Sequence, residues 1–302
     1  MPRSRKKMLF VYNPRSGRGE IANALSDILV RFTSAGYDIT VHPTLSSKDG
    51  QGFIAKHGNE FDIVVSSGGD GMLHEHFAGM MAGNVTVPCG YIPAGTVNDF
   101  ASSLMISKAP VEAAETIVNG KFKAIDVGTF NDSVFSYVAA FGLFTKVSYS
   151  TDQNMKNALG FLAYLIEILK SMDLKHFHEA SVHAKISIND KEYEDDFIFG
   201  FAGNTLSVGG LTTLIPTGAE MDDGLLDFMF VKTPKTLFEL DKIRQALMTK
   251  KLDIPEIICD QAGSAVIETA RAIEWTLDGE YGGKCDHVGL GIKNKAVKIA
   301  VP

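Results

Sequence analysis

The sequence predicts an α/β domain with a doubly wound parallel sheet, followed by an antiparallel β-sandwich domain. In residues 1–124, short β-branched apolar runs alternate with amphipathic helical patterns, which is typical of a parallel sheet covered by helices. In residues 125–290, short strand patterns bounded by turns follow one another, which favours a sandwich. The change of pattern near Lys123 therefore predicts the domain boundary.

Composition narrows the class of protein. The chain has 302 residues, 45% hydrophobic and 22% charged, as expected for a globular chain of about two domains. Its formal net charge of -7 argues against nucleic-acid binding, which needs a basic surface. Three cysteines without a CxxC spacing suit a reducing compartment. The apolar run after the basic start, residues 8–12, is too short for an export signal, so we expect a cytoplasmic protein.

The first domain is expected to alternate strands and helices. Apolar and β-branched runs predict strands over residues 8–12, 37–42, 63–65 and 85–92. Apolar residues at helical spacing predict helices over residues 21–32, around 53–54, over 73–81 and over 110–118. Because each helix lies between two strands, the sheet is predicted to be parallel.

Three turns rich in glycine, proline and small polar residues directly follow predicted strands. They span residues 13–19, 68–71 and 93–100, and Thr44 lies just past the second strand. The carboxyl ends of parallel strands meet at one edge of the sheet, so we expect these turns to gather there. Glycine lets a ligand approach the backbone, and a helix N-terminus attracts phosphate. For residues 68–71 taken alone, a tight turn that binds nothing is the alternative.

The second domain is expected to consist mostly of strands. They are predicted over residues 124–130, 134–140, 181–188, 197–202, 225–231, 254–258, 265–268 and 272–277, with helices over 157–172 and 234–248. The helix over 157–172 is too short and too interrupted by charges to span a bilayer. Core packing and a wall of a lipid-binding cleft are its two interpretations.

Two acidic turns in the second domain are candidate sites. Residues 220–225 place carboxylates and carbonyls before a strand, an oxygen-rich arrangement that suits Mg²⁺, with a solvated turn as the alternative. Asp278 and Glu280 follow another strand, and an exposed hairpin turn is the alternative there. Asp278 becomes a candidate general base if it meets the glycine-rich edge of the first domain.

Five short motifs occur in one order along nearly the whole chain. They are Asn13-Pro14-x-Ser16-Gly17, Gly68-Gly69-Asp70-Gly71, Pro93-x-Gly95-Thr96-x-Asn98-Asp99-Phe100, Asp222-Asp223-Gly224-x-Leu226-Asp227 and Asp278-Gly279-Glu280. In this combination the sequence resembles the diacylglycerol kinase catalytic-domain family, which includes bacterial lipid kinases and the sphingosine and ceramide kinases.

The resemblance implies a function. It implies ATP-dependent transfer of the γ-phosphoryl group to a lipid hydroxyl. The expected acceptor is diacylglycerol, which would give phosphatidic acid, and the expected cofactors are ATP and Mg²⁺. It also implies a lipid presented at the inner face of a membrane, to which the enzyme binds peripherally, and leaves a homodimer open. The last strand, near 290–302, is implied to return to the nucleotide-binding domain. A non-catalytic nucleotide- or lipid-sensing module, and a kinase of another lipid or small alcohol, are the alternatives.

The resemblance also assigns residues. The implied nucleotide-binding residues are Asn13, Pro14, Arg15, Ser16, Gly17, Thr44, Gly68, Gly69, Asp70, Gly71, Met72, Leu73, His74, Glu75, Thr96, Asn98 and Asp99. Asp223, with the carbonyls of Glu220 and Leu225, corresponds to a Mg²⁺ site of structural type. Asp278 is the favoured proton acceptor and Glu280 its alternative. Three residues depart from the family pattern: Met72 stands where Thr is usual, His74 where Asn is common, and Ser102 where bacterial members usually have Arg.

Overall fold

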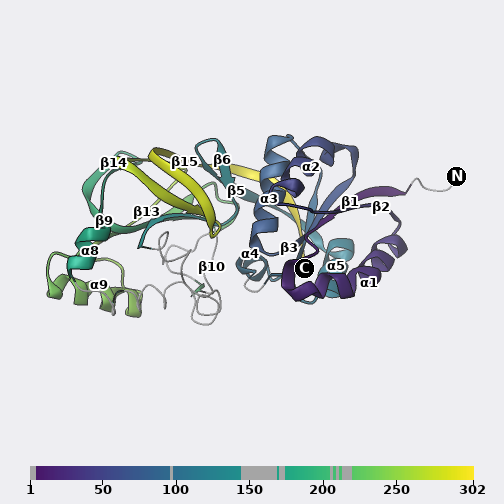
Figure 1. The fold of residues 1–302 in the computed structure, drawn as a ribbon, viewed down its shortest axis with the longest axis horizontal. Coiled ribbons are helices and arrows are strands. Elements are labelled where there is room, and N and C mark those ends of the chain that lie inside the picture. The colour runs from purple at the N-terminus through teal and green to yellow at the C-terminus, as the bar shows by residue number, and fades with distance from the viewer. Residues whose placement is uncertain are drawn as a thin grey trace. The chain divides into compact units, whose positions relative to one another are not determined.

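The structure is a computed structural model that describes residues 5–95, 98–143, 169, 174–204, 207–208, 211–212 and 220–302 (Figure 1). The chain divides into two compact units. The first unit consists of Met1–Val127 and Lys295–Pro302, and the second of Gly128–Asn294. Sequence reasoning places the first of these boundaries at 124/125.

The first unit is built on a parallel sheet with the strand order β2-β1-β3-β4-β15. The strands are β1 (Lys6–Tyr12), β2 (Tyr37–Pro43), β3 (Ile63–Gly68), β4 (Cys89–Pro93) and the end of β15 (Glu280–Val301). The register pairs Met8 with both Ile39 and Ile63, and Ile299 pairs with Cys89. This is a doubly wound order, in which the direction of the crossovers reverses between β1 and β3.

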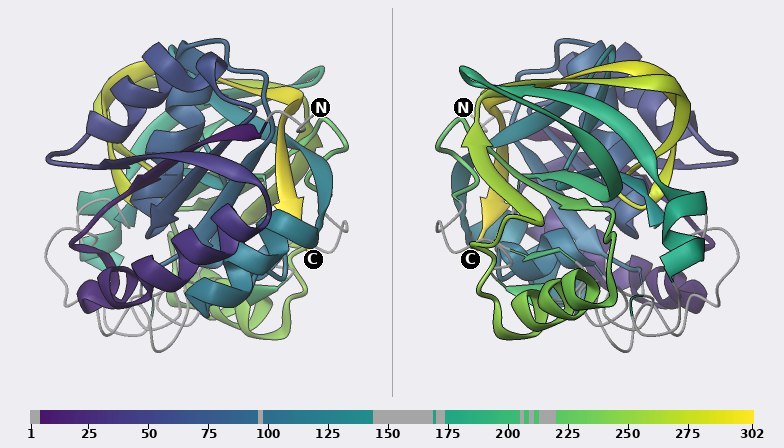
Figure 2. Two further views of the ribbon diagram at one scale, coloured as in Figure 1. Left: turned by 90° about the vertical axis from the view of Figure 1, so that its right-hand side faces the viewer. Right: turned by 90° about the vertical axis from the view of Figure 1, so that its left-hand side faces the viewer.

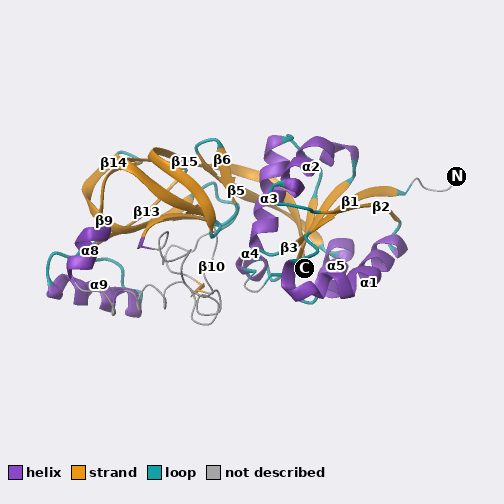
Figure 3. Cartoon of the chain, viewed as in Figure 1, coloured by secondary structure: helices purple, strands orange, loops and turns teal. Residues whose placement is uncertain are grey.

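Helices cover both faces of this sheet (Figure 3). They are α1 (Glu20–Ser34), α2 (Asp49–His57), α3 (Asp70–Ala82), the short α4 (Asp99–Ser103) and α5 (Pro110–Asn119), with single turns η1 (Ser16–Gly19) and η2 (Gly58–Glu60). Helix α1 packs beside α5, and α2 packs beside α3. Covered on two sides, the central strand β3 is buried at every residue, which explains its unbroken apolar start.

The second unit is an antiparallel sheet with the order β13-β12-β9-β7-β14-β15, in which β8 pairs with both β9 and β14. Its strands are β5 (Lys121–Phe130, shared with the first unit), β6 (Ser133–Phe135), β7 (Val138–Gly142), β8 (Val182–Ile188), β9 (Lys191–Gly203), β12 (Leu226–Lys232), β13 (Ile257–Ala262) and β14 (Ser264–Leu277), with a small hairpin of β10 (Ser207–Val208) and β11 (Leu211–Thr212). Two helices, α8 (Leu174–Ala180) and α9 (Leu237–Thr249), accompany it.

One apolar core fills the second unit. It combines Phe228 and Phe230 from one end of the sheet with Val288 and Leu290 from the other, so the sheet curves around its own inner face (Figure 2). Trp275 belongs to this core, and the centre of its ring lies 5.1 Å from the ring centre of Phe130 and 4.9 Å from that of Phe141. This is the sandwich-like packing that a run of short strands predicts.

Several strand boundaries differ from the expectation. The runs 265–268 and 272–277 form one strand, β14, whose register shifts between Glu268 and Ile273. The run 134–140 is instead two strands, β6 and β7. Strand β4 begins only at Cys89, β13 begins at Ile257, and β15 is much longer than expected. The helix expected over 157–172 lies outside the described residues except for Leu169, which is buried.

The described part of the chain contains no helix that could cross a membrane. None of its helices combines the length and apolar character that a bilayer-spanning helix needs.

Candidate active site

The residues that follow β2, β1, β3 and β4 lie at one edge of the first sheet. The N–H of Thr44 donates to the Tyr12 carbonyl at 2.9 Å, that of Asn13 to the Ser67 carbonyl at 3.0 Å, and that of Ala94 to the Gly68 carbonyl at 2.7 Å. The expected convergence of the three turns is therefore confirmed. The edge includes the reversal point between β1 and β3, where open α/β sheets bind their ligands.

The first turn follows β1, and hydrogen bonds to Asn13 hold it in shape. Asn13 Oδ1 accepts the N–H of Arg15 at 2.9 Å, and the Asn13 carbonyl accepts the N–H of Ser16 at 3.2 Å. Pro14 lies between them. Gly17 has a φ of +58°, and a Cβ there would collide with the Ala94 carbonyl oxygen. The turn needs glycine at this position because it packs directly against the turn after β4.

The glycine turn joins β3 to α3. Gly69 caps the helix, which begins at Asp70, and its carbonyl accepts the N–H groups of Met72 at 3.0 Å and Leu73 at 3.2 Å. The N–H groups at the start of a helix have no intrahelical partner, so those of Gly69 and Gly71 suit an anion such as phosphate. A Cβ added to Gly95 would lie only 2.6 Å from the Gly69 Cα. The glycine turn and the turn after β4 are thus in direct backbone contact.

Asn98 holds the turn after β4 in place. It is 2% exposed with a φ of +55°, its Oδ1 accepts the Gly95 N–H at 2.9 Å, and its Nδ2 donates to the Gly95 carbonyl at 2.7 Å. Its own N–H donates to Asp70 Oδ2 at 3.1 Å. The side chain of Asn98 therefore braces the turn. Thr96 and the side chain of Asp99 lie outside the described residues.

A loop after β2 is tied to α3. The N–H of Lys48 donates to Glu75 Oε1 at 2.8 Å, and the N–H of Leu45 donates to Asp49 Oδ2 at 2.8 Å. The Leu45 N–H, with a smaller effect from His42, lowers the pKa of Asp49. Thr44 and Glu75 both lie beside Gly50. Glu75 thus positions the loop that carries Thr44, while His74, next to it, is half-buried.

Met72 and Leu73, two of the expected nucleotide-binding residues, have buried side chains. Met72 is 6% exposed and its Cε lies against Gly50, while Leu73 is fully buried. Their N–H groups are already bonded to the Gly69 carbonyl. Both side chains pack in the core behind the turn, and a part for these two residues in nucleotide binding stays a prediction.

Two buried residues behind the site were not predicted. The Tyr91 hydroxyl donates to the Gly68 carbonyl at 2.8 Å, and His76 Nδ1 lies 2.6 Å from Ser66 Oγ. Burial, with a smaller effect from the Asp70 charge, raises the pKa of Tyr91 well above its usual range. Burial lowers the pKa of His76 to about 3, so this histidine is neutral at physiological pH. Both groups stabilise the end of β3.

The acidic turn of the second unit lies just before β12. Glu220 and Asp223 are exposed, Gly224 has a φ of +79°, and Asp223 Oδ1 accepts the Leu225 N–H at 2.9 Å. Within the described residues, no three or more His, Cys, Asp or Glu side chains cluster in a way that would hold a metal. A carboxylate with two carbonyls and water is nonetheless an all-oxygen donor set, which fits Mg²⁺.

Asp278 lies in the turn between β14 and β15 and is 3% exposed. Its Oδ2 accepts the Ser136 N–H at 2.7 Å, and its Oδ1 accepts those of Tyr137 at 2.9 Å and Val138 at 3.1 Å. These bonds fix the link between β6 and β7. Glu280, two residues further on, is exposed. Asp278 therefore has a structural role whatever its chemistry, whereas a change at Glu280 leaves these bonds in place.

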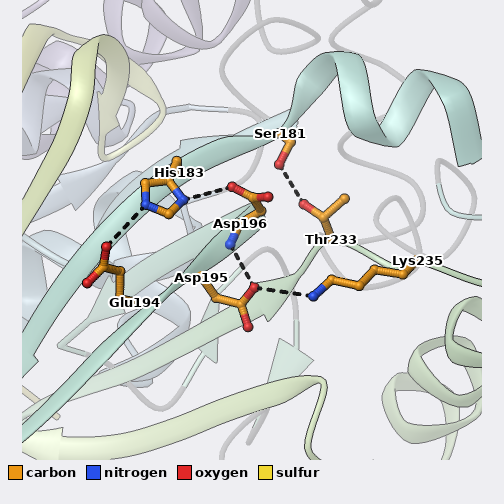
Figure 4. A network of polar contacts seen from close by, with 7 residues as sticks. All are labelled: Ser181, His183, Glu194, Asp195, Asp196, Thr233 and Lys235. Carbon is orange, nitrogen blue, oxygen red and sulfur yellow. Dashed lines mark hydrogen bonds and ion pairs between the residues drawn. The ribbon is translucent and has the colours of Figure 1, made fainter.

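A cavity of about 360 Å³ lies elsewhere in the second unit, and none of the predicted site residues lines it. His183 borders it, with Asp196 Oδ1 2.9 Å from Nδ1 and Glu194 Oε1 3.4 Å from Nε2 (Figure 4). The Asp196 carboxylate, followed by that of Glu194, raises the pKa of His183. The ring pairs neighbouring strands at an exposed surface, where such ion pairs stabilise little.

Comparisons with known proteins agree with this architecture. Residues 7–130 match the family model described as diacylglycerol kinase catalytic domain, and residues 138–300 match the YegS C-terminal NAD kinase beta sandwich-like domain. The chain is 31% identical over 281 residues to the diacylglycerol kinase of Bacillus subtilis (strain 168), covering 92% of this chain and 91% of that protein. It is 32% identical to that of Staphylococcus aureus (strain MRSA252), covering 93% and 88%.

A solved structure shares the fold. The crystal structure of a diacylglycerol kinase from Bacillus anthracis str. Sterne superposes with a TM-score of 0.80 at 24% identity, covering 99% of this chain and 98% of that one. Together, the two family matches and the relatives named diacylglycerol kinase identify the chain as a phosphotransferase. The chain belongs to the diacylglycerol kinase catalytic-domain family and is a lipid kinase.

Proposed function

We propose that this protein transfers the γ-phosphoryl group of ATP to the hydroxyl of a diacylglycerol, giving phosphatidic acid. The observation that carries the proposal is the contact of the three strand-end turns through Gly17 and Ala94, Gly69 and Gly95, and Asp70 and Asn98. Relatives named diacylglycerol kinase match more than nine-tenths of the chain, which supports the same acceptor.

The nucleotide is proposed to bind along these turns. Phosphoryl transfer depends mainly on positioning and on neutralising charge, and it needs little covalent chemistry from the protein. Backbone N–H groups at the start of α3 supply fixed positive dipoles for the phosphates. Thr44, on the loop that Glu75 anchors, is proposed to contact the nucleoside end. Mg²⁺ bound with ATP would neutralise the phosphate charge.

The acceptor hydroxyl must lose a proton during transfer. A carboxylate within hydrogen-bond reach takes that proton, a contribution of about 10²–10⁴-fold. Asp278 is our favoured candidate because its amide bonds fix the direction of its carboxylate. Glu280 is the alternative, because it is exposed and close in the sequence. Asp223 is proposed to hold a separate Mg²⁺ of structural type, with the carbonyls of Glu220 and Leu225.

A non-catalytic sensor is the main alternative, and the departure from the family pattern at Met72 is what suggests it. Because the Met72 side chain is buried behind the turn, its lack of a hydroxyl is no reason to expect lost activity. Since the acceptor is a membrane lipid, we also propose that the enzyme works as a peripheral protein at the inner face of the membrane.

The acceptor is tested by competition among lipids. The protein is incubated with radiolabelled ATP, Mg²⁺ and detergent micelles that contain diacylglycerol, monoacylglycerol, ceramide and sphingosine together. We expect phosphatidic acid to carry most of the label. Label mainly in ceramide phosphate or sphingosine phosphate would keep the kinase and replace the proposed acceptor.

A further inference from the structure

Helix α9 presents large apolar side chains on both of its sides. Its inner side buries Leu240, Ile243, Ala246 and Leu247. On its outer side, Leu237 is 71% exposed and Phe238 is 70% exposed, next to each other in the first turn. A surface helix normally shows polar residues on its outer side, so an adjacent exposed pair of this size points to a binding surface.

The first turn that carries this pair is firmly closed. Thr236 Oγ1 accepts the Glu239 N–H at 3.1 Å, and Glu239 Oε2 accepts the Lys235 N–H at 2.7 Å. Such a capping box fixes the backbone of the first turn. Leu237 and Phe238 are therefore held outward by a rigid element, so little conformational entropy is lost when a partner binds them.

Basic side chains flank the apolar pair. Lys242 Nζ lies 4.8 Å from the centre of the Phe238 ring and 3.4 Å from Glu256 Oε1. Lys235 Nζ lies 3.9 Å from Asp195 Oδ1 (Figure 4). Both lysine side chains remain partly exposed, so a second anion can still reach them. The segment 234–251 contains five Lys or Arg against two Asp or Glu, although the whole chain has a net charge of -7. Bulky apolar residues flanked by Lys match the boundary between lipid headgroups and acyl chains.

The rest of the helix limits how deeply it inserts. Asp241 and Gln245 lie one and two turns further along the same side and are exposed. Burying the Asp241 carboxylate in a bilayer would be costly. Contact is therefore confined to the N-terminal turn.

We propose that the first turn of α9, with Leu237 and Phe238 as apolar anchors and Lys235 and Lys242 beside them, docks the enzyme on an anionic lipid surface. This inference rests on the proposed function, because a kinase of membrane lipids has to reach a lipid surface to meet its acceptor. Insertion of the Leu237 and Phe238 side chains into the lipid surface removes apolar area from water, while the two lysines attract the headgroup phosphates.

Docking is tested by sedimentation of the full chain with lipid vesicles. The vesicles contain phosphatidylcholine, with or without phosphatidylglycerol. The variant L237Q/F238Q is compared with M248Q, which removes another exposed apolar side chain from the same helix and is the matched control. Met248 is 62% exposed and lies at the opposite end of α9. Thermal unfolding of each variant checks that the fold is intact.

We expect L237Q/F238Q to bind vesicles at least about tenfold more weakly than wild type, as the loss of two partly inserted side chains implies. M248Q should bind like wild type. K235E/K242E should lose binding only to vesicles that contain phosphatidylglycerol. Equal vesicle binding by wild type and L237Q/F238Q would overturn the docking proposal. A change from dimer to monomer in L237Q/F238Q, with vesicle binding unchanged, would also overturn it and assign the pair to a second copy of the chain.

Failure of docking and failure of the proposed function are distinguishable. With diacylglycerol in detergent micelles, which present no extended anionic surface, L237Q/F238Q should phosphorylate as fast as wild type. Vesicle binding that depends on Leu237 and Phe238, in a protein that phosphorylates no lipid, would support docking and refute the proposed function.

Discussion

The backbone N–H of Asn98 donates to Asp70 Oδ2 at 3.1 Å, and this bond joins two turns that follow different strands of the sheet. Asp70 begins α3, and Asn98 is buried at the start of α4. The Asp70 carboxylate therefore holds the two turns together, in addition to any contact that it makes with a ligand. A substitution at Asp70 must be chosen so that these two roles are separated.

Substitution of Gly95 should be more harmful than substitution of Gly69. In Gly95→Ala, the new Cβ would lie 2.6 Å from the Gly69 Cα and 2.8 Å from Asn98 Oδ1, so the turns must separate. We expect a loss of about 1–3 kcal/mol in the free energy of unfolding. In Gly69→Ala the nearest atom is the Gly95 Cα at 3.4 Å, so the fold should be kept while kcat/KM for ATP falls.

The control for this pair is Gly52→Ala, because nothing lies within 4 Å of a Cβ at that exposed helix position. It should be as stable as wild type or slightly more stable. Urea unfolding and ATP kinetics measure all three variants. Equal stability of Gly95→Ala and Gly52→Ala would contradict the close contact between the turns.

Asp278→Asn should lower stability as well as activity. An amide NH₂ in place of a carboxylate oxygen would face backbone N–H groups, which leaves buried donors without an acceptor and costs about 1–3 kcal/mol. Glu280→Gln should unfold like wild type. Transfer is measured below the melting temperature of each variant, together with the Kd for ATP. If Glu280→Gln is the inactive variant and Asp278→Asn still transfers, Glu280 is the base.

His76 should make the protein sensitive to acid. Its pKa is about 3 in the folded chain and 6.5 when unperturbed, so between these values the unfolded chain binds more protons. The contribution of neutral His76 to the free energy of unfolding is therefore complete above about pH 6.5. It falls by about 1.4 kcal/mol per pH unit as the pH is lowered toward the folded-state pKa. Urea unfolding of wild type and His76→Gln should show a stability difference that shrinks with acidification. A difference independent of pH would show that His76 is not titrated on unfolding.

Added Mg²⁺ should raise the melting temperature of the wild-type protein if Asp223 holds the ion. At a concentration one hundred times the Kd, the stabilisation would be about 2.7 kcal/mol. Asp223→Asn keeps an oxygen acceptor for the Leu225 N–H but weakens the metal site, so it should lose this response. An equal response in wild type and Asp223→Asn would place the stabilising ion elsewhere.

Local sequence patterns predicted the parts of the site that are contiguous in the chain. A buried strand, a glycine turn and a helix follow one another within residues 63–82, so β3, the turn and α3 could be anticipated. The meeting of the three turns followed from the geometry of parallel sheets. The backbone contact between Gly69 and Gly95 could not be anticipated, because spacing in the sequence does not give distances between turns.

The other features could not be predicted from the sequence, because they depend on contacts between residues far apart in the chain. Strand β15 contains Gly282, Gly283, Gly289 and Gly291 among charged residues, so it lacks the alternation of a typical strand and is held by its neighbours. The amide bonds to Asp278 come from residues about 140 positions earlier in the chain. Met72 stood in a binding motif, yet tertiary packing turned its side chain into the core.

We assign phosphoryl transfer to a lipid to the turns around Asp70. The most direct test of this assignment measures transfer of radiolabel from ATP to diacylglycerol by wild type and by Asp70→Asn. The asparagine keeps an oxygen for the Asn98 N–H and removes the charge, so the fold should be retained. We predict labelled phosphatidic acid with wild type and a rate about 10²-fold lower with folded Asp70→Asn. Wild-type protein that binds ATP without labelling any lipid, or an Asp70→Asn variant as fast as wild type, would refute this role of the turns.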